Sequence, residues 1–237
     1  MLLGIKKVIS FDDTNIKIFN KGIIINGIFF AKKKLKSKTS SLKIYQGPKY
    51  LILNKNFAYK KRKSLSKKLN VLISSGGADK RMFLYKIVKI LNKLYNFKLN
   101  VLIGRGVKKS NKIFNFSRFN NVKLIKKSDN IKKYFDASDI CFVTGGIVMF
   151  ESIACGKITF VSKSYDHQKY AINFFRRKNL VKYIGAPNKI KKKVIYKYLN
   201  KDKNLSNLYN YCFNKSIRII DGNGLLRVNN IIKKYIQ

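Results

Sequence analysis

The sequence is poor in the residues on which most catalytic sites depend. Its 237 residues include ten acidic side chains, of which Glu151 is the one glutamate, and a single histidine, His167. It has no second histidine, no pair of catalytic carboxylates and no serine nucleophile motif of the GxSxG type. We therefore assign no catalytic residue.

Cysteine and long apolar runs are also scarce. The three cysteines, Cys141, Cys155 and Cys212, lack metal-ligand spacing, so we expect neither a metal site nor a cofactor. No apolar run approaches the roughly 20 residues that span a bilayer. The opening MLLGIKKVIS is too short and too soon charged for a secretory signal. We therefore expect a cytoplasmic, reduced protein with no membrane span.

Negative charge is rare, and the formal net charge is +43. Such a charge favours polyanions, so one hypothesis is a nucleic-acid or anionic-membrane partner. However, 45 of the 53 basic residues are lysines, and they are spread along the whole chain. Tryptophan is absent, whereas Asn, Ile, Tyr and Phe are abundant, which is typical of an A- and T-rich genome. Specific phosphate recognition usually recruits arginine. We favour the compositional explanation and do not expect a nucleic-acid partner.

From Leu69 onward, apolar runs of strand length alternate with helical stretches. Near-continuous apolar strands between helices are typical of a parallel sheet that is buried on both faces. The pattern predicts an α/β, doubly wound domain, in which ligands bind beyond the carboxyl ends of the strands. The predicted strands are 70–75, 100–104, 122–126, 139–145, 157–162 and 180–185, and the predicted helices are 80–95, 130–136, 146–155 and 168–177.

The motif SSGGADKR, residues 74–81, follows the first of these strands and opens a helix. Glycines let backbone N–H groups approach a phosphate, and a helix N-terminus favours negative charge. Gly76 and Gly77 are therefore candidate phosphate contacts. Asp79 suits the N-cap or first turn of the helix, and we count it with the two glycines among the candidate ligand-binding residues. The alternative is a turn that needs glycine for steric reasons only.

The motif VTGGIVMFE, residues 143–151, repeats this device with Gly145 and Gly146. Glu151 lies near the second turn of the following helix, where a carboxylate can accept two hydrogen bonds from a ribose diol. The alternative is a surface glutamate. The helix is largely apolar, and burying a carboxylate without a partner is costly, so we favour the ligand role.

The turn after the fifth strand carries Asp166, His167 and Gln168. Gln168 can bind hydroxyls or phosphate, and His167 can donate to phosphate. Helix capping by Asp166 with an incidental histidine is an equal alternative.

In this order, GGADKR, the segment from Ser128 to Val161, DHQ and DGNGLLR resemble the C-terminal half of the UDP-sugar hydrolases of pseudaminic-acid biosynthesis. That family is related to the C-terminal domain of glycosyltransferase family 28 and shares the GT-B fold. YQGPKYLILNKNF, residues 45–57, resembles the segment that precedes this domain. The similarity runs from about Ile9 to Arg227.

The resemblance implies a hydrolase that releases UDP from a diacetamido-trideoxy-hexose in nonulosonic-acid synthesis. It divides the chain into a remnant of the N-terminal GT-B domain with its linker (1–60), a nucleotide-binding Rossmann-like domain (61–216) and a C-terminal helix that crosses back (217–237). It places the ribose on Glu151 and the diphosphate on the two glycine pairs. His167 and Gln168 form the polar turn.

The sequence departs from the family in three places. Ile147 and Val148 stand where the family usually has Ser or Thr, and Ile158 replaces a proline. The family's N-terminal glycine-rich loop with its catalytic histidine has no match. Two alternatives therefore stay open: a donor-binding subunit of a GT-B glycosyltransferase, or an inactive fragment that needs a separate N-terminal partner. A nucleic-acid-binding protein is a third and weaker one.

Overall fold

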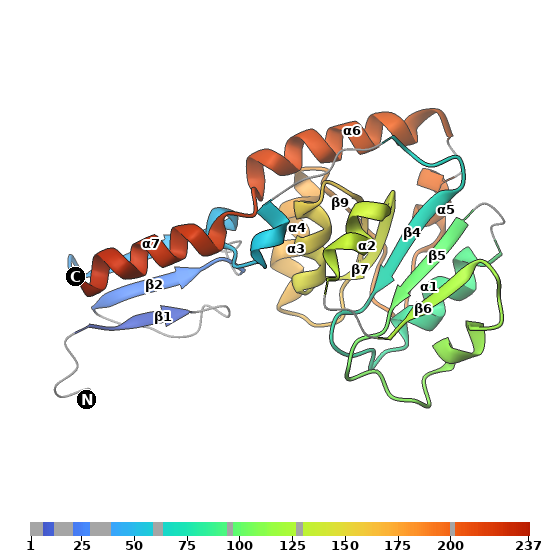
Figure 1. Ribbon diagram of the computed structural model, residues 1–237, viewed down its shortest axis with the longest axis horizontal. Coiled ribbons are helices and arrows are strands. Elements are labelled where there is room, and N and C mark those ends of the chain that lie inside the picture. The colour runs from blue at the N-terminus through green and yellow to red at the C-terminus, as the bar shows by residue number, and fades with distance from the viewer. Residues whose placement is uncertain are drawn as a thin grey trace. The chain divides into compact units, whose positions relative to one another are not determined.

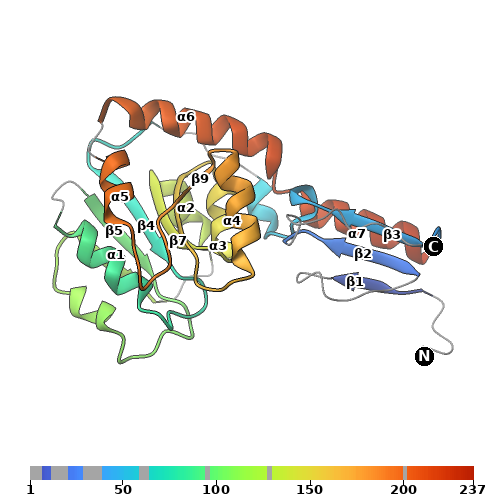
Figure 2. The same cartoon turned by 180° about the vertical axis from the view of Figure 1, so that it is seen from behind.

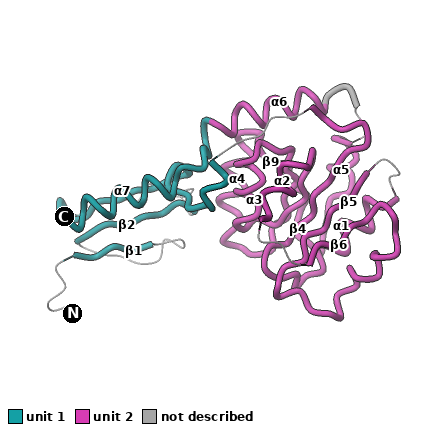
Figure 3. The backbone as a smooth tube through the Cα atoms, viewed as in Figure 1, with its two compact units in different colours: residues 1–59, 218–237 teal, residues 60–217 magenta. Residues whose placement is uncertain are grey.

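The computed structural model describes residues 7–11, 21–28, 39–58, 64–93, 97–126, 130–199 and 202–237. The chain divides into two compact units (Figure 3). One unit comprises Met1–Tyr59 with Arg218–Gln237, and the other comprises Lys60–Ile217. Each unit has a sheet of its own. Among the described residues, no helix is both long enough and apolar enough to cross a membrane.

The larger unit is built on a six-stranded parallel sheet (Figure 1). The strand order is β6-β5-β4-β7-β8-β9, with every neighbouring pair parallel. All six predicted strand runs form strands, and the predicted doubly wound parallel sheet is confirmed. The strands are β4 (Leu69–Ser74), β5 (Phe97–Leu102), β6 (Val122–Ile125), β7 (Ile140–Thr144), β8 (Ile158–Ser162) and β9 (Val181–Tyr183).

Helices cover both faces of this sheet (Figures 1 and 2). Phe142 and Phe160 are register partners on one face, where their rings stack at 4.6 Å and pack in one core cluster with α1 and α5. On the other face Thr159 hydrogen-bonds Ser152 of α3 at 2.7 Å. Alternate side chains of β8 are therefore buried on opposite faces, which explains its uninterrupted apolar sequence. The helices are α1 (Phe83–Leu91), α2 (Lys132–Ala137), α3 (Ile147–Ala154), α4 (Gln168–Arg177), α5 (Lys192–Leu199) and α6 (Asp202–Ile219).

Helix α1 begins three residues later than predicted, at Phe83 rather than Lys80. Met82 precedes it in the left-handed region, with φ of 55°, so regular helix cannot start earlier. The prediction also missed a 3-10 helix, η3 (Lys112–Phe116). The last predicted residues of the α1 stretch, 94–95, lie outside the described residues.

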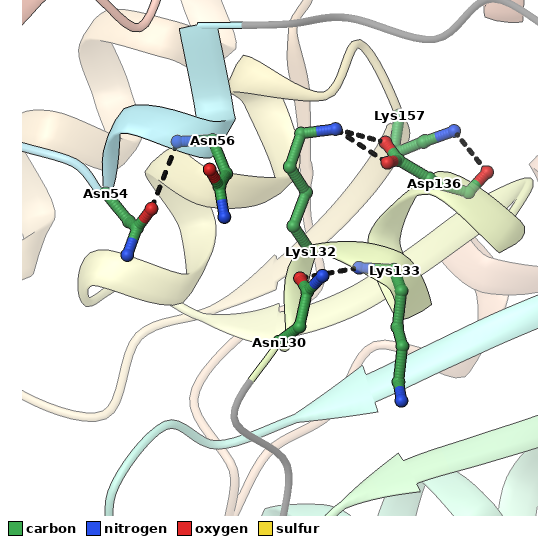
Figure 4. A network of polar contacts seen from close by, with 7 residues as sticks. All are labelled: Asn54, Asn56, Asn130, Lys132, Lys133, Asp136 and Lys157. Atoms are coloured by element: carbon green, nitrogen blue, oxygen red, sulfur yellow. Dashed lines mark hydrogen bonds and ion pairs between the residues drawn. The ribbon is translucent and has the colours of Figure 1, made fainter.

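An ion pair between buried Lys132 and half-buried Asp136 stabilises α2 (Figure 4). Lys132 Nζ lies 2.6 Å from a carboxylate oxygen of Asp136, and Lys157 Nζ donates to the backbone carbonyl of Asp136 at 3.2 Å. At the start of the helix, the side chain of Asn130 accepts from the N–H of Lys133. Buried charges are tolerated when paired in this way, so these lysines serve the fold.

The smaller unit contains a three-stranded parallel sheet of β1 (Ile9–Phe11), β2 (Gly22–Asn26) and β3 (Leu42–Gln46). Helix α7 (Gly224–Ile236) packs on it, with Val228 against Ile23 and Ile25. Two short 3-10 helices, η1 (Pro48–Tyr50) and η2 (Lys55–Ala58), follow β3.

Two motifs far apart in the sequence meet in this unit. A side chain at Gly224 would lie 2.0 Å from the carbonyl oxygen of Leu51, so only glycine allows the approach. Arg227 donates to the carbonyl oxygen of Lys49 at 3.1 Å and also pairs with Asp221. The DGNGLLR and YQGPKYLILNKNF segments are therefore one packing unit.

Candidate functional site

A cleft of about 900 Å³ opens at the carboxyl end of the larger unit's sheet. Its walls come from the segments that follow β4, β5, β6, β7 and β8. The strand order reverses between β4 and β7, and doubly wound folds bind ligands at this reversal. Thr144 Oγ1, at the end of β7, donates to the carbonyl oxygen of Ser75 at 3.0 Å and ties the two turns together.

Gly76 and Gly77 form an open turn in the cleft wall. Gly76 has φ of +79°. Apart from the adjacent residues in the chain, no atom of the described residues lies within 4 Å of where a side chain would begin at Gly76 or Gly77. A Cβ at Gly104 would lie 2.1 Å from the carbonyl oxygen of Gly76, so glycine at this position lets the two loops approach each other closely. Gly106 N–H donates to the carbonyl oxygen of Gly77 at 2.8 Å, which fixes the turn. The turn presents backbone, free of side chains, to the cleft.

Asp79 lines the cleft but is engaged by the protein itself. Its carboxylate accepts from the N–H of Phe83 at 2.7 Å, from the N–H of Leu84 at 3.2 Å and from the amide of Asn111 at 3.1 Å. Burial raises the pKa of Asp79, and these hydrogen bonds oppose that rise. The side chain of Asp79 thus caps α1, although Asp79 lies three residues before the N-cap residue Met82 and not at the predicted N-cap or first-turn position. Its predicted contact with the ligand stays a prediction.

Gly145 and Gly146, the second glycine pair, have different structural roles. A Cβ at Gly145 would lie 2.7 Å from Ile172 Cδ1, so this glycine makes room for α4 and lies outside the cleft lining. Gly146 lines the cleft and is the N-cap residue of α3. The first N–H groups of a helix have no partner inside it, so those of Ile147 and Val148 are donors at the cleft wall.

Glu151 lies one turn further along α3 and faces the cleft with Ile147 and Val148. It is half-buried, and among the described residues its carboxylate makes neither a hydrogen bond nor an ion pair. Burial alone raises its pKa to about 7. Ionised Glu151 is therefore an uncompensated acceptor in a partly dry site.

Gln168 and His167 separate in the structure. Gln168 is buried in the cleft wall, where its Oε1 accepts from the N–H groups of Ser164 at 2.8 Å and Tyr165 at 3.2 Å. Its amide nitrogen lies 3.9 Å from the position that a Cβ at Gly146 would take. His167 is exposed and does not line the cleft, but its ring lies parallel to that of Tyr165 at 5.7 Å.

The sequence interpretation passed over the charged rim of the cleft. Lys80, Arg81, Arg105 and Lys126 all line it, and all are exposed. One signal in the sequence could have found it: two of the eight arginines lie in or near the glycine turns after strands, Arg105 between Gly104 and Gly106 and Arg81 four residues after Gly77. Tyr165 also lines the cleft, and nothing in its local sequence marks it.

The cleft combines backbone donors, a cationic rim and one carboxylate, Glu151, that has no partner among the described residues. This set fits a ligand that is anionic at one end and offers hydroxyl groups at the other. No group of three potential metal ligands from His, Cys, Asp or Glu occurs in the part of the chain that the structure describes.

Two curated proteins are similar to this chain. An uncharacterised protein of Methanocaldococcus jannaschii is 29% identical over 166 residues, which cover 64% of this chain and 34% of that protein. The spore coat polysaccharide biosynthesis protein SpsG of Bacillus subtilis is 22% identical over 234 residues, covering 96% of this chain and 69% of SpsG. The chain thus spans about a third of the first relative. No protein-family model matches.

Solved structures show the fold. MurG of Acinetobacter baumannii superposes with a TM-score of 0.61 at 14% identity, over 90% of this chain and 67% of its own. The glycotransferase of kitacinnamycin superposes with a TM-score of 0.58 at 14% identity, over 91% of this chain and 55% of its own. MnaA of S. aureus, in a co-structure with UDP, superposes with a TM-score of 0.51 at 17% identity, over 72% of this chain and 47% of its own. The chain has the Rossmann-like α/β fold of GT-B glycosyltransferases.

Proposed function

We propose that this chain binds the UDP moiety of a nucleotide sugar in the cleft of the larger unit. The diphosphate would contact the backbone of Gly76, Gly77 and Gly146, and the ribose hydroxyls would donate to Glu151. MnaA, a neighbour in fold, has been solved with UDP, and SpsG is named for polysaccharide biosynthesis. Both names agree with a nucleotide-sugar ligand.

The observation that carries the proposal is the state of Glu151. A half-buried carboxylate with no donor among the described residues loses hydration without compensation. A ribose diol would supply two donors at this position. Hydrogen bonds from a ligand would therefore compensate for the desolvation of the carboxylate.

The test is a calorimetric titration of UDP into the wild type, Glu151→Gln and Glu151→Ala. Hydrogen bonds to a charged group contribute about 1.5–3 kcal/mol, so we expect roughly 10- to 100-fold weaker binding in both variants. The 2′-deoxy analogue of UDP should bind the wild type more weakly than UDP does, and this difference should shrink in Glu151→Ala.

Asp166→Asn is the matched control, because Asp166 is an exposed carboxylate outside the cleft. It removes the same charge and should leave UDP binding within about twofold. A DNA duplex titrated at rising salt measures the general attraction of polyanions to the basic chain. Salt-sensitive DNA binding without UDP binding would favour the nucleic-acid alternative and reject this proposal.

For the reaction, we propose a place in a UDP-sugar hydrolase that releases UDP from a diacetamido-trideoxy-hexose in nonulosonic-acid synthesis. The motif resemblance supports this assignment. The alternative is the donor-binding part of a glycosyltransferase, completed by a separate N-terminal partner, in keeping with the glycotransferase among its neighbours in fold. UDP release that needs only water supports the hydrolase, and release that needs a sugar acceptor supports the transferase.

A further inference from the structure

An arginine and a tyrosine from two different loops meet at the rim of the cleft. The guanidinium carbon of Arg81 lies 5.9 Å from the centre of the Tyr165 ring, within the range of a cation–π contact. The ring of His167 lies parallel to Tyr165 at 5.7 Å. Arg81 and Tyr165 both line the cleft and are both exposed.

The strand order places the contact between Arg81 and Tyr165 across the end of β7. Arg81 belongs to the segment after β4, and Tyr165 to the segment after β8. In the sheet, β7 lies between β4 and β8. The pair therefore spans the carboxyl end of β7, where Gly146 and the first N–H groups of α3 face the cleft.

Arg81 has no carboxylate partner in the described part of the chain. The nearby Asp166 is paired with Lys163 at 2.6 Å, and the hydrogen bond from Lys163 is the main cause of its lowered pKa, with Arg81 a smaller one. Asp79 is used by α1 and Asn111. The five N–H donors of the guanidinium can therefore bind a ligand while the ring of Tyr165 restrains the side chain. Lysine has neither the planar group that stacks on an aromatic ring nor the fork of donors.

We propose that Arg81, held above the Gly146 turn by Tyr165, binds the ligand's diphosphate and makes the cleft select diphosphates over monophosphates. The inference rests on the proposed nucleotide site and assigns its charge selectivity to one side chain. Backbone N–H groups at the two glycine turns bind one phosphate group, and the guanidinium of Arg81 donates paired hydrogen bonds to the oxygens of the second. His167 acts through Tyr165 by packing against its ring.

The test compares UDP, UMP and uridine by calorimetry in the wild type, Arg81→Ala, Arg81→Lys and Tyr165→Leu. We expect Arg81→Ala to weaken UDP about 10- to 100-fold, UMP far less, and uridine not at all. Arg81→Lys should recover only part of the loss, because it restores the charge without the fork. Tyr165→Leu should weaken UDP by about two- to fivefold, the strength of an exposed cation–π contact.

Lys169→Ala is the matched control. Lys169 is exposed, lies in α4 near the same loop and does not line the cleft, so its loss changes the net charge equally. Equal losses in Lys169→Ala and Arg81→Ala would reduce the effect to general electrostatics and overturn the inference. UDP binding that is unchanged in Arg81→Ala would do the same while leaving the proposed function intact. Failure of the wild type to bind UDP would reject the proposed function itself.

Discussion

Glu151 carries an ionisable carboxyl group on a largely apolar helix. Its helix buries Met149, Phe150 and Ile153, and it faces a cleft rather than open water. Four cationic side chains line the same cleft, but burial is the one resolved cause of its raised pKa. A ligand that donates hydrogen bonds to this carboxylate, as in the proposed ribose contact, would compensate for its burial.

This setting predicts a pH-dependent stability. The folded pKa of Glu151 is raised to about 7 from 4.5, so the unfolded chain loses this proton first and stability falls between pH 4.5 and 7. At pH 8 the free energy of unfolding of Glu151→Gln should exceed that of the wild type by at most about 3 kcal/mol. Near pH 4 the two proteins should have the same free energy of unfolding. Urea denaturation at both pH values measures this.

The control for this prediction is Asp166→Asn, which removes an exposed carboxylate whose pKa is lowered, first by the hydrogen bond from Lys163. It should give no gain in stability at pH 8. If Glu151→Gln stabilised the protein equally at pH 4 and pH 8, side-chain packing rather than ionisation would be the cause.

At the scale of elements, two loops and the start of one helix build the part of the cleft wall where we propose that the diphosphate binds. Gly104 packs against the turn at Gly76 and Gly77, and α3 begins at Ile147, directly after its N-cap residue Gly146. These glycines differ in purpose. Gly104 is required by packing, because its hydrogen occupies the space next to a carbonyl oxygen, whereas Gly77 meets open space.

Alanine at these two glycines should therefore act differently. Gly104→Ala forces a methyl group to within 2.1 Å of a carbonyl oxygen, so it should lower the free energy of unfolding by about 1–3 kcal/mol and shift the turn. Gly77→Ala should change stability by less than about 0.5 kcal/mol, yet weaken UDP binding because its methyl group stands at the cleft wall. Thermal unfolding and UDP titration separate the two effects. A destabilised Gly77→Ala would contradict the open geometry.

At the scale of the whole molecule, the charge and the cleft are separate features. The net charge of +43 comes mostly from lysines spread over the chain, whereas the cleft draws on two arginines of the eight present. General attraction of anions is thus a property of the surface, and recognition is a property of a few positioned groups.

The purified chain should bind UDP but release it from UDP-sugars at close to the uncatalysed rate. Among the described cleft residues, Asp79 is engaged at α1 and Glu151 is assigned to the ribose, so no carboxylate or histidine remains as a general base. An assay for released UDP, with and without a sugar acceptor, measures this. Robust turnover by the chain alone would show that a catalytic group lies within it.

Much of the larger unit was predictable because its signals are local. Apolar runs of strand length marked every strand of the six-stranded sheet, and the stretch from Gly146 to Cys155 marked α3. The start of α1 was not predictable, because it depends on the carboxylate of Asp79 reaching forward and on Asn111 from a distant loop. The ligand roles of the predicted site residues stay predictions.

By itself, the sequence determined the parallel α/β architecture, the glycine turns at the strand ends and the position of Glu151 in the second turn of an apolar helix. Only the tertiary structure decided that Gly145 serves packing while Gly146 faces the cleft, that His167 stands outside it, and that Arg81 meets Tyr165 across the end of β7. The reason is physical. Periodicity records how a segment buries its own side chains, whereas a ligand site is made where separate segments meet.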